Sequence, residues 1–453
     1  MKKFFVSMGL AVAGTASLQA AYAPDLGPLS STKIWNVSAT LRGFYDDNYD
    51  TANGGLNPRG SYGFELSPQL MLAVPLQQTE LGLRNTYAMS YYQEREQLGQ
   101  SSVDQSDQLD LWVDHAFTER WQMKVLDTFA VAQEPQLLTP NATPTSLPFR
   151  VEGSNIRNTG TITLNTDWTR QFSTSLNYQN SIYDFQNSGA SVADIVNNYF
   201  GVPGAQGASL AGLMNRIDQT VSLDFQWHIA PETMVFFGGS FEQVSYTSDE
   251  PIAFSPILPG NIYYSRSRDN RSYFGYAGAQ HSLLPNLNIS ARAGVQYTEY
   301  YNDPLSSASV APYAVLSVVY TYSPGCYAEV GLNQQRNATD VIGQLNNSVS
   351  PTSPNYGKLT QDQESTVVYG SVNHLITPKL LGSIIGSWQY STFEGGAYDS
   401  SSDSYYTVGL NLAYTFTPNF SAEFGYNFDD IQSNVFERGY TRNRVYIGVT
   451  AAY

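Results

Sequence analysis

The chain has 453 residues, of which 42% are hydrophobic and only 14% are charged, against about 25% charged in an average soluble protein. Its 33 Tyr and 22 Phe argue against wholesale disorder, and beyond the N-terminus no stretch is apolar for as long as a spanning helix requires. The formal net charge of −16 disfavours nucleic acid as a partner, because phosphates are neutralised by Lys and Arg. The single cysteine, Cys326, excludes an internal disulfide and a cysteine metal cluster.

The N-terminus has the three regions of a secretory signal peptide. Lys2 and Lys3 precede a largely apolar run over residues 4–13, and small residues follow as far as Ala21. This order of charged, apolar and cleavage regions predicts export, with residues 1–21 removed. Residues 22–33 are then expected to be a short N-terminal segment, which is too short to form a plug domain.

From residue 34 onward the side chains alternate between apolar and polar. Phe420, Phe424 and Phe428 share one face of their segment, whereas Ser421 and Asn427 lie on the other. A period of two predicts β-strands. Short turns recur between such segments, and they are centred near Pro75, Glu119, Arg170, Pro231, Pro285, Pro324, Pro378 and Pro418.

Each interval between these turns fits two strands and one longer polar loop. The pattern therefore predicts an all-β fold, a transmembrane antiparallel up-and-down β-barrel over residues 34–453. About 18 strands are expected, with 16 as the alternative. A soluble β-propeller is the competing architecture, but it predicts a tighter repeat.

Amphipathic side chains recur at a constant distance from the short turns. They predict an interfacial girdle on the periplasmic side, formed by His115, Trp227, His281, Tyr320, His374 and Tyr414. The last strand presents an apolar outward set that ends on an aromatic residue, namely Val445, Ile447, Val449, Ala451 and Tyr453. This ending resembles the closing strand of bacterial outer-membrane proteins, which implies recognition by the barrel-assembly machinery.

Three stretches, residues 40–49, 130–135 and 152–158, carry a further resemblance. Their sequences are TLRGFYDDNY, AVAQEP and EGSNIRN. Together they are similar to the outer-membrane porins of the β-barrel porin 2 kind. The resemblance implies a porin-like role over nearly the whole mature chain, and it brings no functional residues.

The alternation also predicts which charged side chains line the lumen. The expected basic lining residues are Arg42, Arg84, Arg292, Arg442 and Arg444. The expected acidic lining residues are Glu65, Asp110, Asp114, Asp224, Glu329 and Glu423. Because the last strand of a closed barrel pairs with the first, Arg42, Arg442 and Arg444 are expected to form a basic strip beside the closure. A wall with separate positive and negative stripes would orient dipolar solutes. The alternative, which we expect for any single residue, is that these charges are simply solvated or paired in a wet lumen.

Two long loops are candidates for constricting the lumen. Loop 134–157 carries four prolines, and loop 187–215 contains a helix-like piece over residues 191–200 that ends at Gly201. The second loop is hydrophobic at Ile195, Phe200, Leu210, Leu213 and Met214. We expect it to bury this surface inside the barrel, the alternatives being to cover the mouth or contact a neighbouring subunit.

We find no sequence basis for catalysis or for a metal or other cofactor. His228 faces inward, but the sequence shows no partner for it beyond the neighbouring Asp224, and no nucleophile motif is present. Asp46, Asn48 and Asp50 have calcium-ligand spacing, but the rest of the EF-hand pattern is missing, so a solvated acidic loop is expected.

The sequence thus predicts a non-enzymatic, multi-pass outer-membrane channel for passive diffusion of ions and small polar solutes, with both mature termini in the periplasm. The alternatives are a channel selective for an oligosaccharide or nutrient, and a surface adhesin or structural barrel that acts through its loops. The expected partners are outer-membrane lipid, the barrel-assembly machinery and small polar solutes, and a homo-oligomer is left open.

Overall fold

The computed structural model describes residues 34–53, 57–96, 101–132, 155–202, 207–305, 307–342, 350–435 and 438–453. The predicted signal peptide, the predicted segment 22–33 and most of loop 134–157 lie outside the described residues.

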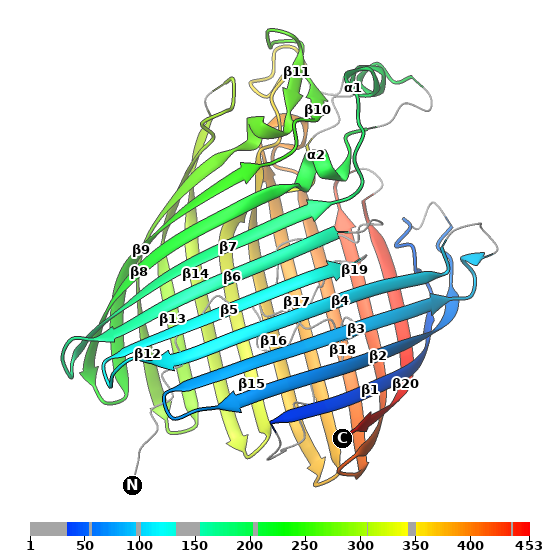
Figure 1. The fold of residues 1–453 in the computed structure, drawn as a ribbon. Coiled ribbons are helices and arrows are strands. Elements are labelled where there is room, and N and C mark those ends of the chain that lie inside the picture. The colour runs from blue at the N-terminus through cyan, green and yellow to red at the C-terminus, as the bar shows by residue number, and fades with distance from the viewer. Residues whose placement is uncertain are drawn as a thin grey trace.

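Eighteen antiparallel strands form one sheet that closes on itself as a barrel (Figure 1). The first nine strands are β1 (Trp35–Asp46), β2 (Ser61–Pro75), β3 (Thr79–Tyr92), β4 (Val103–Ala116), β5 (Trp121–Ala132), β6 (Asn155–Asp167), β7 (Phe172–Phe185), β8 (Arg216–Ala230) and β9 (Thr233–Tyr246). The other nine are β12 (Asn270–Leu284), β13 (Leu287–Glu299), β14 (Ala308–Ser323), β15 (Cys326–Asn337), β16 (Asp362–Thr377), β17 (Leu380–Glu394), β18 (Ser402–Thr417), β19 (Phe420–Ser433) and β20 (Tyr440–Ala452). The predicted number of 18 strands is confirmed, and the alternative of 16 is wrong.

The barrel closes where the last strand meets the first. β1 pairs with β2 on one side and with β20 on the other, with Asp46 opposite Arg444. The backbone N–H of Tyr453 donates to the carbonyl oxygen of Val37 at 2.8 Å. Closure leaves the sheet without an unpaired edge, as a structure that crosses a membrane with strands requires.

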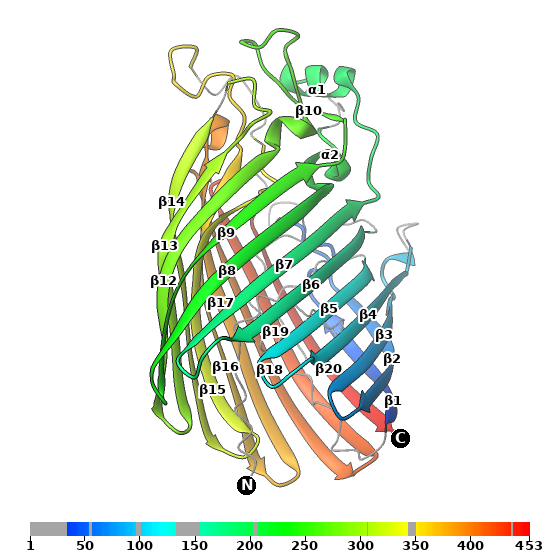
Figure 2. The same ribbon diagram turned by 60° about the vertical axis from the view of Figure 1, so that its left-hand side comes forward.

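All eight predicted short turns join consecutive strands at one end of the barrel (Figures 1 and 2). Backbone hydrogen bonds across these turns include those from Leu76 to Thr79 at 2.7 Å, from Phe117 to Trp121 at 3.0 Å and from Trp168 to Phe172 at 3.1 Å. We call this the short-turn end, and the opposite end the long-loop end. The short connections fix the antiparallel neighbours, so the strand order follows the chain.

Burial alternates along the strands as the period of two predicts. In β20 the side chains of Val445 and Ile447 are 41% and 66% exposed, whereas Arg444 and Tyr446 are buried. An outward apolar face of this extent around a closed barrel matches a hydrocarbon environment. The described part of the chain contains no helix that is both long and apolar enough to span a membrane.

The predicted girdle residues lie near the short-turn end. Trp227, Tyr320 and Tyr414 are exposed on the outward face. The Nδ1 atom of each predicted girdle histidine is hydrogen-bonded to a hydroxyl oxygen at 2.7 to 2.8 Å. The pairs are His115–Thr79, His281–Thr233 and His374–Tyr322. These bonds fix the ring orientations at the barrel surface.

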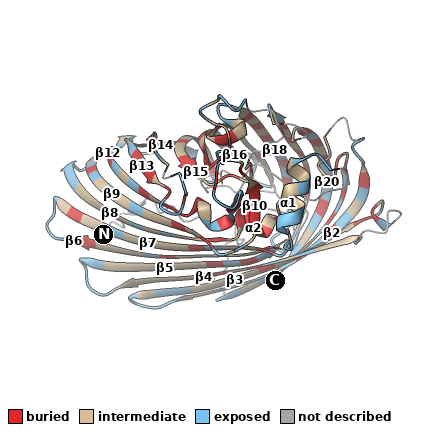
Figure 3. Cartoon of the chain, turned by 90° about the horizontal axis from the view of Figure 1, so that it is seen from above, coloured by how far each residue is buried: buried red, intermediate tan, exposed pale blue. Residues whose placement is uncertain are grey.

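The remaining elements of the described residues belong to the long loops. They are helices α1 (Val192–Tyr199) and α2 (Leu210–Met214), the hairpin β10 (Pro251–Phe254) and β11 (Ile262–Tyr264), and the 3-10 turns η3 (Ser265–Arg268) and η4 (Gly396–Tyr398). Viewed from above, α1, α2 and β10 lie over the barrel opening (Figure 3).

Candidate functional site: the lumen and its mouth

The inward side chains beside the barrel closure form a lattice of ion pairs. Arg42 donates from Nη1 to Glu65 at 2.8 Å and from Nε to Glu423 at 2.5 Å. All three side chains are buried. Arg42 comes from β1, Glu65 from β2 and Glu423 from β19, so three strands are held together across the closure.

Nearer the long-loop end, one carboxylate serves two arginines. Asp46 accepts from Arg442 at 2.7 Å and from Arg444 at 3.0 Å, and Arg444 also donates to the hydroxyl of Tyr92 at 2.7 Å. Asp429 lies 3.8 Å from Arg442. Asp46 is fully buried, and such bonds to charged groups are stronger than neutral ones.

These contacts correct two expectations from sequence. The expected basic strip does not form a positive stripe, because carboxylates from neighbouring strands lie between its guanidinium groups. The expected solvated acidic loop is also wrong for Asp46 and Asn48, which are 0% and 1% exposed. Asp46 forms ion pairs with the two arginines. The side-chain amide of Asn48 donates to the carbonyl oxygen of Thr441 at 2.9 Å.

The other predicted lining residues also occur mostly in opposite-charge pairs. Their shortest ion-pair distances are 2.9 Å for Arg84–Asp110, 3.3 Å for Arg292–Asp224 and 3.4 Å for Lys124–Asp114. Within the described residues, Glu329 makes no ion pair. Arg292 additionally lies over the ring of Tyr276, which donates its hydroxyl to Asp224 at 2.7 Å.

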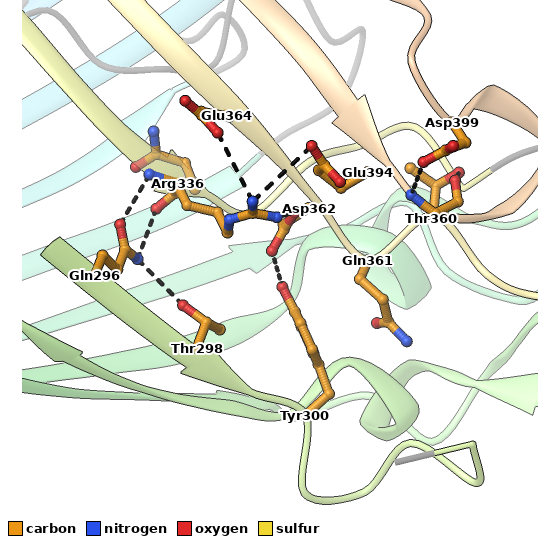
Figure 4. Close-up of polar contacts among 12 residues, drawn as sticks. Gln296, Thr298, Tyr300, Arg336, Thr360, Gln361, Asp362, Glu364, Glu394 and Asp399 are labelled. Atoms are coloured by element: carbon orange, nitrogen blue, oxygen red, sulfur yellow. Dashed lines mark hydrogen bonds and ion pairs between the residues drawn. The ribbon is translucent and has the colours of Figure 1, made fainter. Parts of the chain in front are cut away.

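A denser network, which the sequence did not indicate, lies at the long-loop end (Figure 4). Arg336 pairs with Asp362 at 2.8 Å, and Glu364 and Glu394 lie 3.8 and 4.0 Å from the same guanidinium group. Asp362 also accepts a hydrogen bond from Tyr300. Burial and the neighbouring Asp362 raise the pKa of Tyr300 well above its usual value, so this hydroxyl remains a donor at neutral pH.

Three loop segments pack together over the mouth, and we call them the loop cap: residues 186–215, 247–269 and 338–361, as far as they are described. Their shared hydrophobic core includes Leu213, Ile252, Tyr263 and Leu359, together with Phe185 at the end of β7. These side chains come from segments far apart in sequence. The cap is therefore a folded unit with its own core.

One buried arginine connects all three segments of the loop cap. Arg268, which is 0% exposed, donates to the carbonyl oxygens of Leu213 at 3.1 Å and Gln361 at 3.4 Å, and to that of Thr339. Glu250 adds a second connection by accepting the backbone N–H of Gly189 at 3.0 Å. Nothing in the sequence pattern around Arg268 singled it out.

The position of loop 187–215 differs from the sequence-based expectation. It is part of the loop cap, and α1 lies beyond the strand ends rather than inside the barrel (Figures 1 and 2). The predicted helix is present as α1, with Ser191 and Asp194 in a capping box. Ile195, Leu213 and Met214 are buried as expected, Leu210 packs partly against the core, but Phe200 is 65% exposed.

The two residues considered for catalysis have different surroundings, whereas Asp46 and Asn48, considered for calcium, are joined by a hydrogen bond from the Asn48 backbone N–H to Asp46 at 3.1 Å. Asp224 bonds Tyr276 and Arg292, and His228 is exposed near the short-turn end. Among the described residues, no group of three or more His, Cys, Asp or Glu is arranged to hold a metal ion.

A closed barrel of eighteen strands, apolar outside and polar inside, defines the class of transmembrane β-barrels of the outer membrane. Residues 333–453 match the model of one family, described as "Putative beta-barrel porin 2", which is the resemblance that the sequence suggested. No curated protein sequence matches the chain.

The chain also matches solved structures at 10 to 13% identity. OccAB4 of Acinetobacter baumannii has 13% identity and a TM-score of 0.42, and the match covers 94% of this chain and 100% of that chain. OccK2 (OpdF) of Pseudomonas aeruginosa, solved with glucuronate, has 10% identity, a TM-score of 0.44 and coverage of 92% and 98%. A BenF-like porin from Pseudomonas fluorescens Pf-5 has 10% identity, a TM-score of 0.44 and coverage of 94% and 100%.

Proposed function

We propose that the protein is an outer-membrane channel for passive diffusion of ions and small polar solutes. The supporting observation is the size of the barrel together with the polarity of its inner wall. Side chains fill a barrel of about eight strands, whereas barrels of 16 to 18 strands leave an aqueous channel. The inward faces of this barrel carry Arg, Asp, Glu, Asn and Gln, which suit water rather than a dry core.

The charged lattice would set what passes through the lumen. Alternating guanidinium and carboxylate groups, such as Arg42 between Glu65 and Glu423, present short-range dipoles rather than one broad field. We infer that such a wall favours small polar solutes over large ions of either sign. We assign a lining role to the predicted basic and acidic residues on this basis, and no catalytic role.

The topology of the chain supports an orientation in the membrane. In outer-membrane barrels the short turns are periplasmic and the long loops extracellular. We therefore place the short-turn end, the girdle histidines and both mature termini on the periplasmic side. We also infer that β20, with its outward apolar set and terminal Tyr453, is the segment that the barrel-assembly machinery binds.

The loop cap favours a selective channel over a wide general pore. Its core and the three carbonyl bonds of Arg268 hold folded loops over the mouth, so solutes must pass between the cap and the wall. Whether an oligosaccharide or another nutrient is preferred depends on the dimensions of that passage. A surface adhesin, the alternative function, would also use these loops, but it would not require an open lumen.

Solute uptake into proteoliposomes tests the proposed function. Vesicles containing the folded protein should swell in isotonic solutions of small neutral sugars, with rates that fall steeply as solute size increases. Empty vesicles and vesicles with heat-unfolded protein are the controls. Folded protein that admits no solute of any size would contradict the channel and leave the adhesin.

A further inference from the structure

One arginine on the inner wall of the barrel has no acidic partner among the described residues. Within the barrel strands the structure describes ten Lys and Arg side chains. Eight of them have a carboxylate oxygen at 3.4 Å or less. The two exceptions among these ten are Arg157 of β6 and Arg271 of β12.

The alternation of burial places these two arginines on opposite faces of the wall. Arg157 shares its face of β6 with Thr161, which is 4% exposed, so it points into the lumen. Arg271 shares its face of β12 with Tyr273, which is 45% exposed, so it points outward. In the described strands, Arg157 is therefore the lumen-facing cation that lacks a carboxylate.

The strands on either side of Arg157 provide no counter-charge. The strand register sets it opposite Ala130 of β5 and Tyr183 of β7. Among the described strands, the nearest lumen-facing carboxylates are Asp110 and Asp218, each one inward position closer to the short-turn end and two strands away. Two strand spacings correspond to about 10 Å. Each of these carboxylates is already paired with a different arginine, at 2.9 and 3.0 Å.

The guanidinium group of Arg157 also lacks hydrogen-bond acceptors. Its Nε atom is withdrawn from solvent and has no partner within the described part of the chain. A charged donor without an acceptor is costly away from water. The side chain as a whole is partly exposed, so a solute in the lumen can reach it. A guanidinium group presents its N–H donors as a planar fork that matches the two oxygens of a carboxylate.

The two neighbours of Arg157 suit the carbon skeleton of an organic solute. Ala130 contributes a methyl group, and Tyr183 contributes an aromatic ring on the other side. Arg216 of β8 lies 4.2 Å from the ring centroid of Tyr183, and the same ring packs against the core of the loop cap. Tyr183 is thus held in place directly below the cap, which puts Arg157 close to the entrance of the lumen.

We propose that Arg157 and Tyr183 form a binding site on the lumen wall for the carboxylate group of a small organic anion. A monoanion matches the single uncompensated guanidinium charge, whereas a dianion would bring a second negative charge toward Asp110 and Asp218. As a step in transport, the site rests on the proposed channel and specifies the class of solute. As a binding site, it does not depend on conductance.

Protection from phenylglyoxal, a reagent that modifies guanidinium groups, tests binding in detergent-solubilised protein. The probe is lactate, and lactamide at the same ionic strength is the neutral control. Peptide mass mapping should show that lactate slows the modification of Arg157 about threefold or more and that lactamide does not. Arg266, whose side chain is 57% exposed, is the internal reference and should react equally in both solutions.

Three results of the labelling experiment would overturn the proposal. The first is that Arg157 does not react, because it would then be inaccessible from the lumen. The second is that lactate and lactamide protect it equally, or that Arg266 is protected as well. The third is faster labelling of Arg157 in the ligand-free Glu134→Gln/Glu152→Gln variant, which would assign a carboxylate of the chain itself as the partner.

The reversal potential of a sodium lactate gradient across a planar bilayer links the site to passage. The lactate-to-sodium permeability ratio should fall about threefold or more in Arg157→Gln. Arg157 has no carboxylate partner among the described residues, so this change should leave the heat-resistant barrel intact. Arg271→Gln is the matched control, because it removes the same charge from the outward face and should leave the ratio unchanged.

The two experiments separate the site from the channel. An equal permeability ratio in Arg157→Gln and Arg271→Gln would contradict the role of Arg157 in passage. Current through a protein in which lactate does not protect Arg157 would overturn the site and leave the channel. Protection of Arg157 in a folded protein that passes no current would overturn the channel and leave the binding site.

Discussion

At the scale of single residues, the barrel interior depends on guanidinium groups that each meet carboxylates from other strands. Asp46 and Arg442 are separated by most of the chain, yet they are 2.7 Å apart because β20 closes against β1. Asp46 is buried, so removing its carboxylate would leave the guanidinium charges of Arg442 and Arg444 poorly compensated. Its contribution is therefore larger than that of an exposed pair.

Replacing Asp46 with asparagine should destabilise the barrel and change its ion preference. The change removes the charge shared by Arg442 and Arg444, and breaking such a buried pair costs about 3 kcal/mol. Urea titration of the folded barrel should show this loss. The reversal potential in a salt gradient should shift toward anions, because two guanidinium groups lose their shared counter-charge.

The control for this change is Glu119→Gln, which removes one negative charge in an exposed short turn. That variant should leave the unfolding free energy and the reversal potential close to wild type. A wild-type reversal potential in Asp46→Asn would mean that the closure lattice does not face the permeation path.

The sequence predicted which face of its strand each charged side chain occupies, but not which residue it pairs with. Arg84 and Asp110 could be assigned to one face from the alternation alone, because a period of two requires only local sequence. That Asp46 would serve two arginines depends on the register of β1 against β20, which no local pattern encodes.

At the scale of elements, the loop cap is the feature that sequence reasoning placed wrongly. Hydrophobic positions in loop 187–215 correctly indicated that this surface is buried. They could not indicate which residues this surface packs against, because its partners are distant in sequence. These partners are the β10–β11 hairpin and the segment around Leu359. Capping chemistry is local, by contrast, so helix α1 was predictable from Ser191 and Gly201.

Arg268→Met should loosen the loop cap and widen the passage. The change removes charged hydrogen bonds to three backbone carbonyls, each worth about 1.5 to 3 kcal/mol when buried. Single-channel conductance should rise, and proteases should cut the loops faster, while the barrel itself melts as in wild type. Arg266→Met is the matched control, because Arg266 is half exposed and pairs only with the exposed Asp249 among the described residues. Unchanged conductance in Arg268→Met would show that the cap does not limit flow.

The capping box should stabilise helix α1 against hydrogen exchange only when the carboxylate of Asp194 is ionised. Hydrogen bonds from Ser191 lower the pKa of Asp194 below its ordinary value. A lowered folded-state pKa stabilises the helix above the unfolded value of about 3.9, and this is lost as pH falls through the folded pKa. Hydrogen exchange over residues 192–199, corrected for intrinsic rates, should therefore show stronger protection at pH 6 than at pH 3.

Ser191→Ala provides the control for the capping box. It removes the hydroxyl bonds at both pH values, so exchange of α1 should be faster at pH 6 and should depend less on pH. Equal protection of wild-type α1 at the two pH values would contradict this role of Asp194.

At the scale of the whole molecule, the alternation, the eight short turns and the apolar closing strand together determine a closed barrel. Each is a local pattern repeated around the molecule, so the sequence was sufficient for the strand number. The polarity of the inner wall and the loops over the mouth support the proposed channel with a restricted entrance. Transport follows from this combination rather than from any single residue.

Planar-bilayer recording tests this account most directly. Purified, folded protein should insert and give discrete conductance steps that are larger in Arg268→Met than in wild type. Protein that migrates as a folded barrel, incorporates into the bilayer and yet passes no current in either form would contradict the existence of a water-filled lumen.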